Sequence, residues 1–431
     1  MSVLSYFAVI ALLIVLISVI NEKWLHIQSD IVLIIFSLGI SLVLLGLEQI
    51  PEITPYIEAV REQNHFDFAA YLLDGVLCFM LFAGASRVSM VKFTQNIRPI
   101  SLLALVGTVV SSAVYGLLFF GIAALCHMNM SLWTCILLGC IVSPTDPIAA
   151  TGILNKLGMS KNVTSVIECE SLFNDGTGVA LFLFVKGIVS QKSGGNFFYI
   201  MGKELFGAII VAVVVSFLLF SFLRLTRDPI KHILISLVDV MLVYCICEHL
   251  GFSGVIASVV CGMIFAYFRN RIARGLAVQD PEKLYDHFWE VVDSILNAVL
   301  FMILGLSVMN VQASSFFAVL LPVAIVIVIL SRYAGVRTCT FFMEKGRLPG
   351  NYNCREFSML MTWSALKGGL SLALALGTAE FLSQDVYLIV LNVAYITIFF
   401  TVLVQGLTTK RVYRVIENKK TKRIKQERDA I

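Results

Sequence analysis

Charged residues are scarce in this sequence: only 14% of its 431 residues are Asp, Glu, Lys or Arg, whereas 58% are hydrophobic. A soluble globular protein carries about 25% charged and roughly 45–50% apolar residues. This shortage of charge, together with apolar runs that extend almost from end to end, excludes a soluble fold. It predicts a helical membrane protein with many spans, for which we expect no nucleic-acid partner.

The sequence also lacks clustered metal-binding residues. The six histidines are scattered, and the ten cysteines occur singly and mostly inside apolar runs. Cys245 and Cys247 form the closest pair, but no histidine stands beside them at zinc spacing. We interpret the cysteines as small apolar packing residues and expect no cofactor and no histidine-based proton relay.

A bilayer-crossing helix needs about 20 apolar residues, and the sequence predicts thirteen such spans. They are 3–20, 30–47, 68–86, 99–126, 131–154, 163–185, 200–223, 231–249, 252–268, 291–309, 315–336, 356–377 and 386–407. The predicted fold is therefore an all-α polytopic membrane protein. We expect a transmembrane domain over 1–409 and a short basic tail over 410–431.

Lysine and arginine predict the orientation of the chain. Most of the 32 basic residues fall in alternate loops and in the tail, and loops rich in Lys and Arg stay in the cytoplasm. This places the N-terminus outside and the C-terminus in the cytoplasm of a cell-membrane protein. We predict an outer interfacial segment over 50–67 and a cytoplasmic basic connector over 268–287. The tail is interpreted as a solvated anchor attracted to anionic lipid, in preference to a regulatory domain.

Four carboxylates gather between apolar runs: Asp146, Glu168, Glu170 and Asp175. Carboxylates at membrane depth are costly and indicate function by default. Pro144 and Pro147 remove backbone donors around Asp146 and disfavour helix before each ring, so we predict a break in this span. Broken helices in mid-membrane are typical of secondary transporters. The alternative, a proline kink with an outward Asp146, would leave a carboxylate in lipid.

The following span predicts the partner of Asp146. Ser171 and Asp175 are four residues apart and share a helix face. At 1.5 Å per residue Asp175 lies roughly 18 Å from the inner end of its span, near the middle of the bilayer. Carboxylate, hydroxyl and backbone oxygens are ligands for a hard cation. Because two neighbouring carboxylates in a low dielectric repel when both are ionised, the site holds a small cation or protons, and each expels the other.

A second interruption is predicted in span 356–377, where Gly368 and Gly369 follow Lys367. Interrupted segments in both halves of a chain indicate a transporter site between inverted repeats. Lys367 can then offset the negative ends of the half-helix dipoles. The alternative is a glycine packing interface, with Lys367 paired to a carboxylate.

Arg332 is predicted to pair with Glu170 and hold two helices in register. The alternative is an arginine that snorkels to the cytoplasmic surface. Asp293 and Asn297, four residues apart, are expected to hydrogen-bond to each other within the bundle.

Several spaced motifs carry a family resemblance. They are Thr145-Asp146-Pro147, Glu170-Ser171, Asn174-Asp175, 253–262, 288–306, Arg332 and 363–376. In these motifs the sequence resembles the monovalent cation/proton antiporters, specifically the bacterial sodium/proton antiporters related to eukaryotic sodium/proton exchangers. The resemblance covers most of the chain.

The resemblance implies a thirteen-helix fold with a six-helix core bundle of crossed, unwound helices and a second bundle that forms a homodimer interface. It implies that Asp175 is the main carrier of cation and proton. Asp146, Ser171 and the backbone carbonyl of Thr145 would complete the coordination of a monovalent cation.

Further roles follow from the same resemblance. Glu170 would pair with Arg332. Asn174 before Asp175 is similar to the branch that exchanges one cation for one proton. Lys367 stands where relatives often have arginine.

The expected function is exchange of intracellular sodium for external protons by alternating access, in a transporter rather than an enzyme. Sodium, lithium and potassium stay open as the cation, and membrane lipid is an expected partner. An intramembrane aspartyl protease is a less favoured alternative, because Gly176 follows Asp175 where a Gly-x-Gly-Asp motif would be expected. A cation channel is disfavoured because channels need pores lined by several subunits. Asp74 and Asp239 are either hydrogen-bonded core acids or parts of an access funnel.

Overall fold

The structure is a computed structural model and describes residues 3–47, 71–146, 148–190, 197–226, 228–273, 281–310, 316–343 and 348–429. Within these residues the chain is helical, and its one extended pairing is an antiparallel bridge between Asp146 and Leu366. The all-α prediction is therefore confirmed.

The helices follow the order of the predicted spans. The first half holds α1 (Val3–Ile20), η1 (Asn21–Leu25), α2 (Ser29–Leu47), η2 (Tyr71–Val76), α5 (Leu77–Ser86), α6 (Met90–Gln95), α7 (Ile97–Ser101), η3 (Leu102–Gly107), α8 (Thr108–Leu125), α9 (Leu132–Val142), α10 (Ile148–Lys156) and α11 (Lys161–Val189). The second half holds α12 (Phe197–Leu223), α13 (Pro229–Leu250), α14 (Gly254–Ala273), α15 (Pro281–Leu306), η4 (Ser307–Asn310), α16 (Phe317–Phe342), η5 (Pro349–Asn351), α17 (Cys354–Trp363), α18 (Gly369–Leu376), α19 (Gln384–Phe399), η6 (Phe400–Gly406) and α20 (Leu407–Asp429).

Among the described residues, nine helices are long and apolar enough to cross a membrane. Three shorter apolar helices, Leu77–Ser86, Leu132–Val142 and Gly254–Phe268, accompany them. The polytopic fold is confirmed, and the count of thirteen crossings stays a prediction.

Both ends of the loop predicted over 268–287 are helical, because α14 continues to Ala273 and α15 already begins at Pro281. The cytoplasmic position of this connector stays a prediction. Charged residues thus extend these helices beyond their apolar parts. The predicted interfacial segment 50–67 lies outside the described residues.

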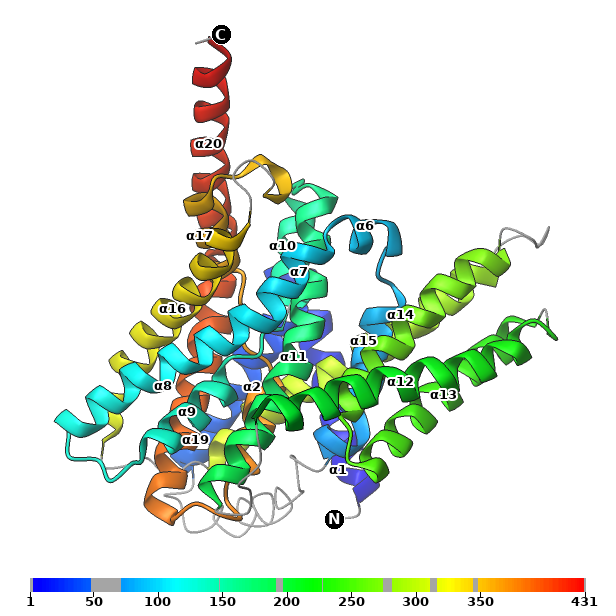
Figure 1. Cartoon of the computed structure of the whole chain (residues 1–431). Coiled ribbons are helices and arrows are strands. Elements are labelled where there is room, and N and C mark those ends of the chain that lie inside the picture. The colour runs from blue at the N-terminus through cyan, green and yellow to red at the C-terminus, as the bar shows by residue number, and fades with distance from the viewer. Residues whose placement is uncertain are drawn as a thin grey trace.

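The helices pack into two groups (Figure 1). We call the first the core bundle; it consists of α8, α9, α10, α11, α16, α17, α18 and α19. We call the second the outer bundle; it consists of α1, α2, α5, α12, α13, α14 and α15. Phe82 and Trp289, both fully buried, pack ring against ring in the outer bundle, with centroids 4.6 Å apart.

Glycines bring three core helices into backbone contact. A Cβ atom on Gly139 of α9 would lie 2.2 Å from the carbonyl oxygen of Ser112 on α8. A Cβ atom on Gly335 of α16 would lie 2.6 Å from the carbonyl oxygen of Gly107, at the end of η3 just before α8. Such close approach is typical of helix packing in membranes. There, van der Waals contacts drive association, and small residues let the helix backbones come close enough to make them.

Both predicted breaks are present. Between α9 and α10 the chain is not helical around Asp146, and between α17 and α18 it is not helical around Leu366. The two breaks cross, because the backbone N–H of Asp146 donates to the carbonyl oxygen of Leu366 at 2.8 Å. The ring of Pro144 lies so close to Gly178 of α11 that a Cβ atom there would be 2.4 Å away.

The basic tail is helical. α20 continues the last membrane helix and contacts α17 and α10, and its Tyr413 and Ile416 are buried. The hydroxyl of Tyr352, just before α17, donates to Glu417 of α20 at 2.7 Å. Burial, and then the hydrogen bond to Glu417, raise the pKa of Tyr352 above its ordinary value, so this hydroxyl stays protonated. The first turns of the tail are thus docked on the core bundle, whereas the sequence predicted a solvated anchor.

Tail and core bundle are also joined by an ion pair. Arg423 of α20 lies 3.3 Å from a carboxylate oxygen of Glu356 and donates to the carbonyl oxygen of Asn351 at 2.7 Å. Glu356 also closes a capping box with Asn353 at the start of α17.

Candidate functional site

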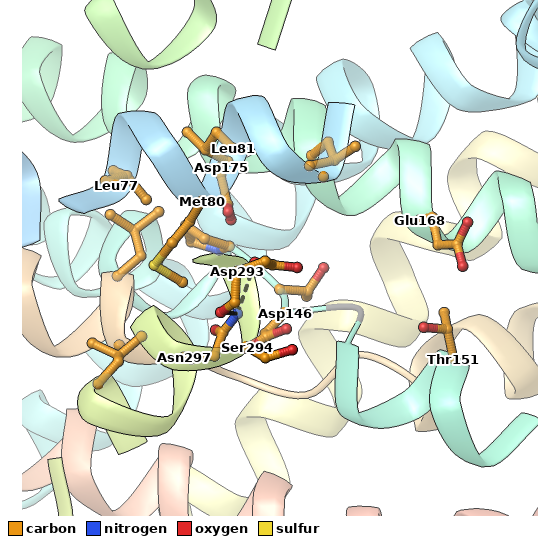
Figure 2. A pocket seen from close by; sticks show the side chains of 18 of the residues that line it. Leu77, Met80, Leu81, Asp146, Thr151, Glu168, Asp175, Asp293, Ser294 and Asn297 are labelled. Atoms are coloured by element: carbon orange, nitrogen blue, oxygen red, sulfur yellow. Dashed lines mark hydrogen bonds between the residues drawn. The ribbon is translucent and has the colours of Figure 1, made fainter. Parts of the chain in front are cut away.

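A cavity of about 510 Å³ lies beside the crossing of the two breaks (Figure 2). The core bundle contributes residues from both breaks and from α10, α11 and α18, and the outer bundle contributes α5 and α15. Its polar lining residues are Arg87, Thr145, Asp146, Thr151, Asn155, Glu168, Asp175, Glu290, Asp293, Ser294, Asn297 and Ser371. Asn155 at the end of α10 is exposed, so the cavity opens on the side of the α10–α11 connection.

Asp146 and Asp175 meet in this cavity, as the sequence predicts. Asp146 sits in the first break and Asp175 on α11, and both half-buried side chains line the cavity (Figure 2). The opposing break approaches Asp146 closely, since a Cβ atom on Gly368 would lie 3.1 Å from the Asp146 carboxylate. Glycine at 368 therefore leaves room for the acid. Neither carboxylate faces lipid, so the outward proline kink is excluded.

Thr145, Ser171 and Asn174 form a buried network behind the two acids. The Thr145 hydroxyl is 3.0 Å from the Ser171 hydroxyl, and Asn174 donates through Nδ2 to Thr145 Oγ1 at 2.6 Å. Asn174 Oδ1 accepts from the backbone N–H of Thr145 at 3.2 Å. Of these three residues, only Thr145 lines the cavity. Asn174 thereby fixes the unwound backbone against α11.

The predicted pair of Glu170 and Arg332 is present and bidentate. Arg332 of α16 donates to the two carboxylate oxygens of Glu170 at 3.0 and 2.9 Å, and the two side chains are only 5% and 1% exposed. Asn174 donates a further hydrogen bond to Glu170 at 2.9 Å. α16 continues to Phe342, well past Arg332, so the snorkelling alternative is wrong. The pair connects α16 through Asn174 to the first break.

Lys367 lies inside the second break and is 2% exposed. Its Nζ donates at 2.9 Å to the carbonyl oxygen of Ser143, which caps the C-terminal end of α9. A cation at this end of a helix stabilises its unsatisfied carbonyl groups. The alternative in which Lys367 serves only a glycine interface is therefore not supported, because its charge meets the other break.

The outer bundle supplies a wall that sequence reasoning only partly identified. Asp293 and Asn297 of α15 are hydrogen-bonded at 2.9 Å, as predicted, but both also line the cavity (Figure 2). Arg87 at the end of α5 forms an ion pair with Asp293. The i, i+4 spacing of Asp293 and Asn297 was visible in the sequence. The sequence alone does not show that this face of α15 is turned toward the crossing of the two breaks.

The sequence left two roles open for Asp74 and Asp239, and the structure decides between them for Asp239. Asp239 of α13 is 1% exposed, accepts a hydrogen bond from Ser216 at 3.2 Å and does not line the cavity. It is a hydrogen-bonded core acid of the outer bundle. The side chain of Asp74 lies outside the described residues.

Crossed, interrupted membrane helices around a carboxylate-lined cavity define a secondary active transporter. A family model for the transmembrane part of sodium/hydrogen exchangers matches residues 8–415. The chain therefore belongs to the sodium/hydrogen exchanger family, which confirms the resemblance seen in the sequence. Because this is a family of transporters, the intramembrane protease alternative is excluded.

Individual relatives agree over most of the chain. The Na(+)/H(+) antiporter NhaP of Pseudomonas aeruginosa is 28% identical over 406 residues, which are 92% of this chain and 94% of that protein. The Na(+)/H(+) antiporter NhaH of Halobacillus dabanensis is 30% identical over 315 residues, which are 72% of this chain and 73% of that protein. The sodium proton antiporter MjNhaP1 of Methanocaldococcus jannaschii has the same fold at 17% identity, with a TM-score of 0.74 over 95% of this chain and 97% of that chain.

Proposed function

We propose that this protein exchanges intracellular sodium for external protons by alternating access, with Asp175 as the group that carries either ion. The observation that supports this function most strongly is the meeting of Asp146 and Asp175 in one cavity beside crossed, unwound helices. Family membership supports the choice of sodium and protons, because the curated relatives are named as Na(+)/H(+) antiporters.

The proposed site uses oxygen ligands from two core helices. Asp146, Asp175 and the Thr145 carbonyl would contact the cation, and Ser171 would act through its hydrogen bond to Thr145. Monovalent and other hard cations prefer such oxygen ligands. When protons occupy the carboxylates the cation loses its counter-charge and leaves, so competition for the same oxygens couples the two fluxes.

The charges of the site favour one-for-one exchange. Glu170 is neutralised by Arg332, and Asn174 stands where a second acid next to Asp175 would raise the charge. Of the two acids at the crossing, Asp146 and Asp175, Lys367 would offset one, which would leave one negative charge for one cation or one proton. A gradient of one pH unit is worth about 1.36 kcal/mol per proton, enough to sustain roughly a tenfold gradient of the cation.

Alternating access follows from the division into two bundles. We propose that the core bundle carries the crossing and its acids past the outer bundle, and that the present cavity is the cytoplasmic opening. The termini lie at opposite ends of the molecule (Figure 1), which agrees with ends on opposite sides of the membrane. The Lys and Arg residues of the tail favour the C-terminus in the cytoplasm and the N-terminus outside. We further propose a homodimer formed through the outer bundle in lipid, which cross-linking in native membranes would test.

The test of function replaces Asp175 by Asn and measures dequenching of a pH-sensitive dye in everted vesicles on addition of sodium, lithium or potassium. Exchange should be lost for every cation. Asp239→Asn is the matched control, since Asp239 is also a buried acid but lies away from the cavity. Retained exchange in Asp175→Asn would remove Asp175 from its role, and a response of the parent protein to potassium alone would replace sodium as the substrate.

A further inference from the structure

The α15 wall of the cavity holds a buried oxygen without a protein partner. Asn297 is 2% exposed and lines the cavity. Its Nδ2 donates to the backbone carbonyl and to the Oδ1 of Asp293, each at 2.9 Å. These two bonds fix the amide, so the acceptor of the group is its Oδ1. Within the part of the chain that the structure describes, this Oδ1 has no hydrogen-bond partner.

A second oxygen of the same kind faces the cavity from the core bundle. Ser371 of α18 is 1% exposed, lines the cavity, and its hydroxyl is without a partner among the described residues. Buried polar groups are normally satisfied, and those that are not call for a ligand, an ion or a water. Two unsatisfied oxygens that line one cavity, on the contacting helices α15 and α18, therefore indicate that something polar binds beside them.

The buried carboxylate of the α15 wall, Asp293, already has a counter-ion. Arg87 forms an ion pair with Asp293, and its Nε donates to the carbonyl oxygen of Ala83 at 3.0 Å, which holds the guanidinium in place. Asp293 is thereby engaged by Arg87 on one side and by Asn297 on the other. The other α15 carboxylate in the lining, Glu290, is 64% exposed and lies 3.8 Å from His287. Beside the buried Asp293, α15 thus offers the cavity the neutral amide oxygen of Asn297. Such an oxygen can coordinate a cation without changing the number of charges exchanged.

We infer that Asn297, positioned by Asp293, is a further ligand of the transported cation in the state in which this cavity is open. This inference rests on the proposed function. Asn297, Asp293, Asp146 and Asp175 all line this cavity (Figure 2). The acids belong to the core bundle and Asn297 to the outer bundle, so the contact breaks when the core bundle moves. Asn297 assists capture at one face of the membrane and has no part in release at the other.

This asymmetry gives the experiment its readout. The apparent KM for sodium is measured from both faces, in everted and in right-side-out vesicles, for the parent protein, Asn297→Ala and Asn297→Asp. Asn297→Ala should raise KM about three- to tenfold at the face where the cavity opens and leave it unchanged at the other face. Asn297→Asp keeps the acceptor oxygen but loses the Nδ2 donor to Asp293, and it should retain sodium affinity at that face.

The aspartate variant separates a ligand from a structural residue. If Asn297 served only to hold Asp293, both variants would lose the same hydrogen bonds and weaken transport equally from both faces, which would overturn the inference. An unchanged KM in Asn297→Ala would overturn it as well. Asn21→Ala is the matched control, because Asn21 is a buried asparagine whose side-chain amide bonds to the backbone of Ile27 and does not line the cavity.

Two further outcomes are distinguishable. If Asp175→Asn is inactive while Asn297→Ala behaves as the parent, the ligand assignment fails and the proposed function stands. If Asp175→Asn still exchanges sodium, the proposed role of Asp175 fails, and the ligand role of Asn297, which rests on it, fails with it. Should Asn297→Ala not insert into the membrane, Asn297→Asp alone decides, because loss of its sodium affinity at both faces contradicts a ligand role.

Discussion

Replacing Arg332 by Met should strongly destabilise the protein, because it removes one partner of a buried ion pair. Among the described residues, the substitution leaves the 1% exposed carboxylate of Glu170 without its bidentate partner and with the hydrogen bond from Asn174. Removing one partner of a buried ion pair costs about 3–5 kcal/mol of unfolding free energy, chiefly because the remaining charge has lost its counter-ion. A loss of that size lowers the ratio of folded to unfolded protein roughly a hundred- to several-thousand-fold.

The measurement is unfolding of the purified protein in mixed micelles by increasing amounts of SDS, followed through tryptophan fluorescence. The two single variants Arg332→Met and Glu170→Gln are compared with the double variant that carries both changes. The double variant removes both charges together, so it should recover at least about 2 kcal/mol relative to the sum of the single losses.

The same cycle has a clear refuting result. If the unfolding free energy of Arg332→Met lies within about 1 kcal/mol of that of the parent protein, the pair contributes no more than a solvated surface ion pair does. If the single losses simply add in the double variant, the two side chains do not interact in the membrane.

Two other predictions concern the core bundle. Gly139→Ala should lower the yield of folded protein and reduce its unfolding free energy by several kcal/mol, because the new methyl group would overlap the backbone of α8. Gly121→Ala is the control and should be neutral, because its methyl group would contact nothing within 4 Å. Unfolding in detergent compares the two variants. Lys367→Met should lower the rate of sodium-driven proton movement in vesicles at least about tenfold, since a hydrogen bond from a charged group is lost. Lys367→Arg should keep more of the rate, and equal rates for both variants would show that the charge at this position has no role in exchange.

The proline and acid pattern was sufficient to predict the architecture of the site. Prolines on both sides of Asp146 cannot stay in a regular helix, and a carboxylate in mid-membrane needs a cavity, so both the break and its meeting with Asp175 followed from local chemistry. The glycines after Lys367 predicted the second break in the same way. The pairing of Glu170 with Arg332 was predictable because neither charge can remain alone in the bilayer.

Tertiary placement was not predictable in the same manner. Asn297 was expected to bond to Asp293, and it does, but which way α15 turns depends on how the two bundles meet. The tail was predicted to be a solvated anchor because its composition is that of a solvated segment. Tyr413 and Ile416 stand among many charged residues in the sequence. Their burial follows only from the packing of α20 against α17 and α10.

The continuous helix at the C-terminus has a mechanical consequence. From Gln384 to Glu427, α19, the π-helical η6 and α20 follow one another over 44 residues, a rod of at most about 66 Å at 1.5 Å per residue. Its lower part belongs to the core bundle, which we propose moves, and its upper part contacts α10 and α17, one half of each broken helix. A fluorophore at the far tip would therefore report each transport cycle from outside the bilayer, with the small tilt of the moving bundle magnified by the length of the lever.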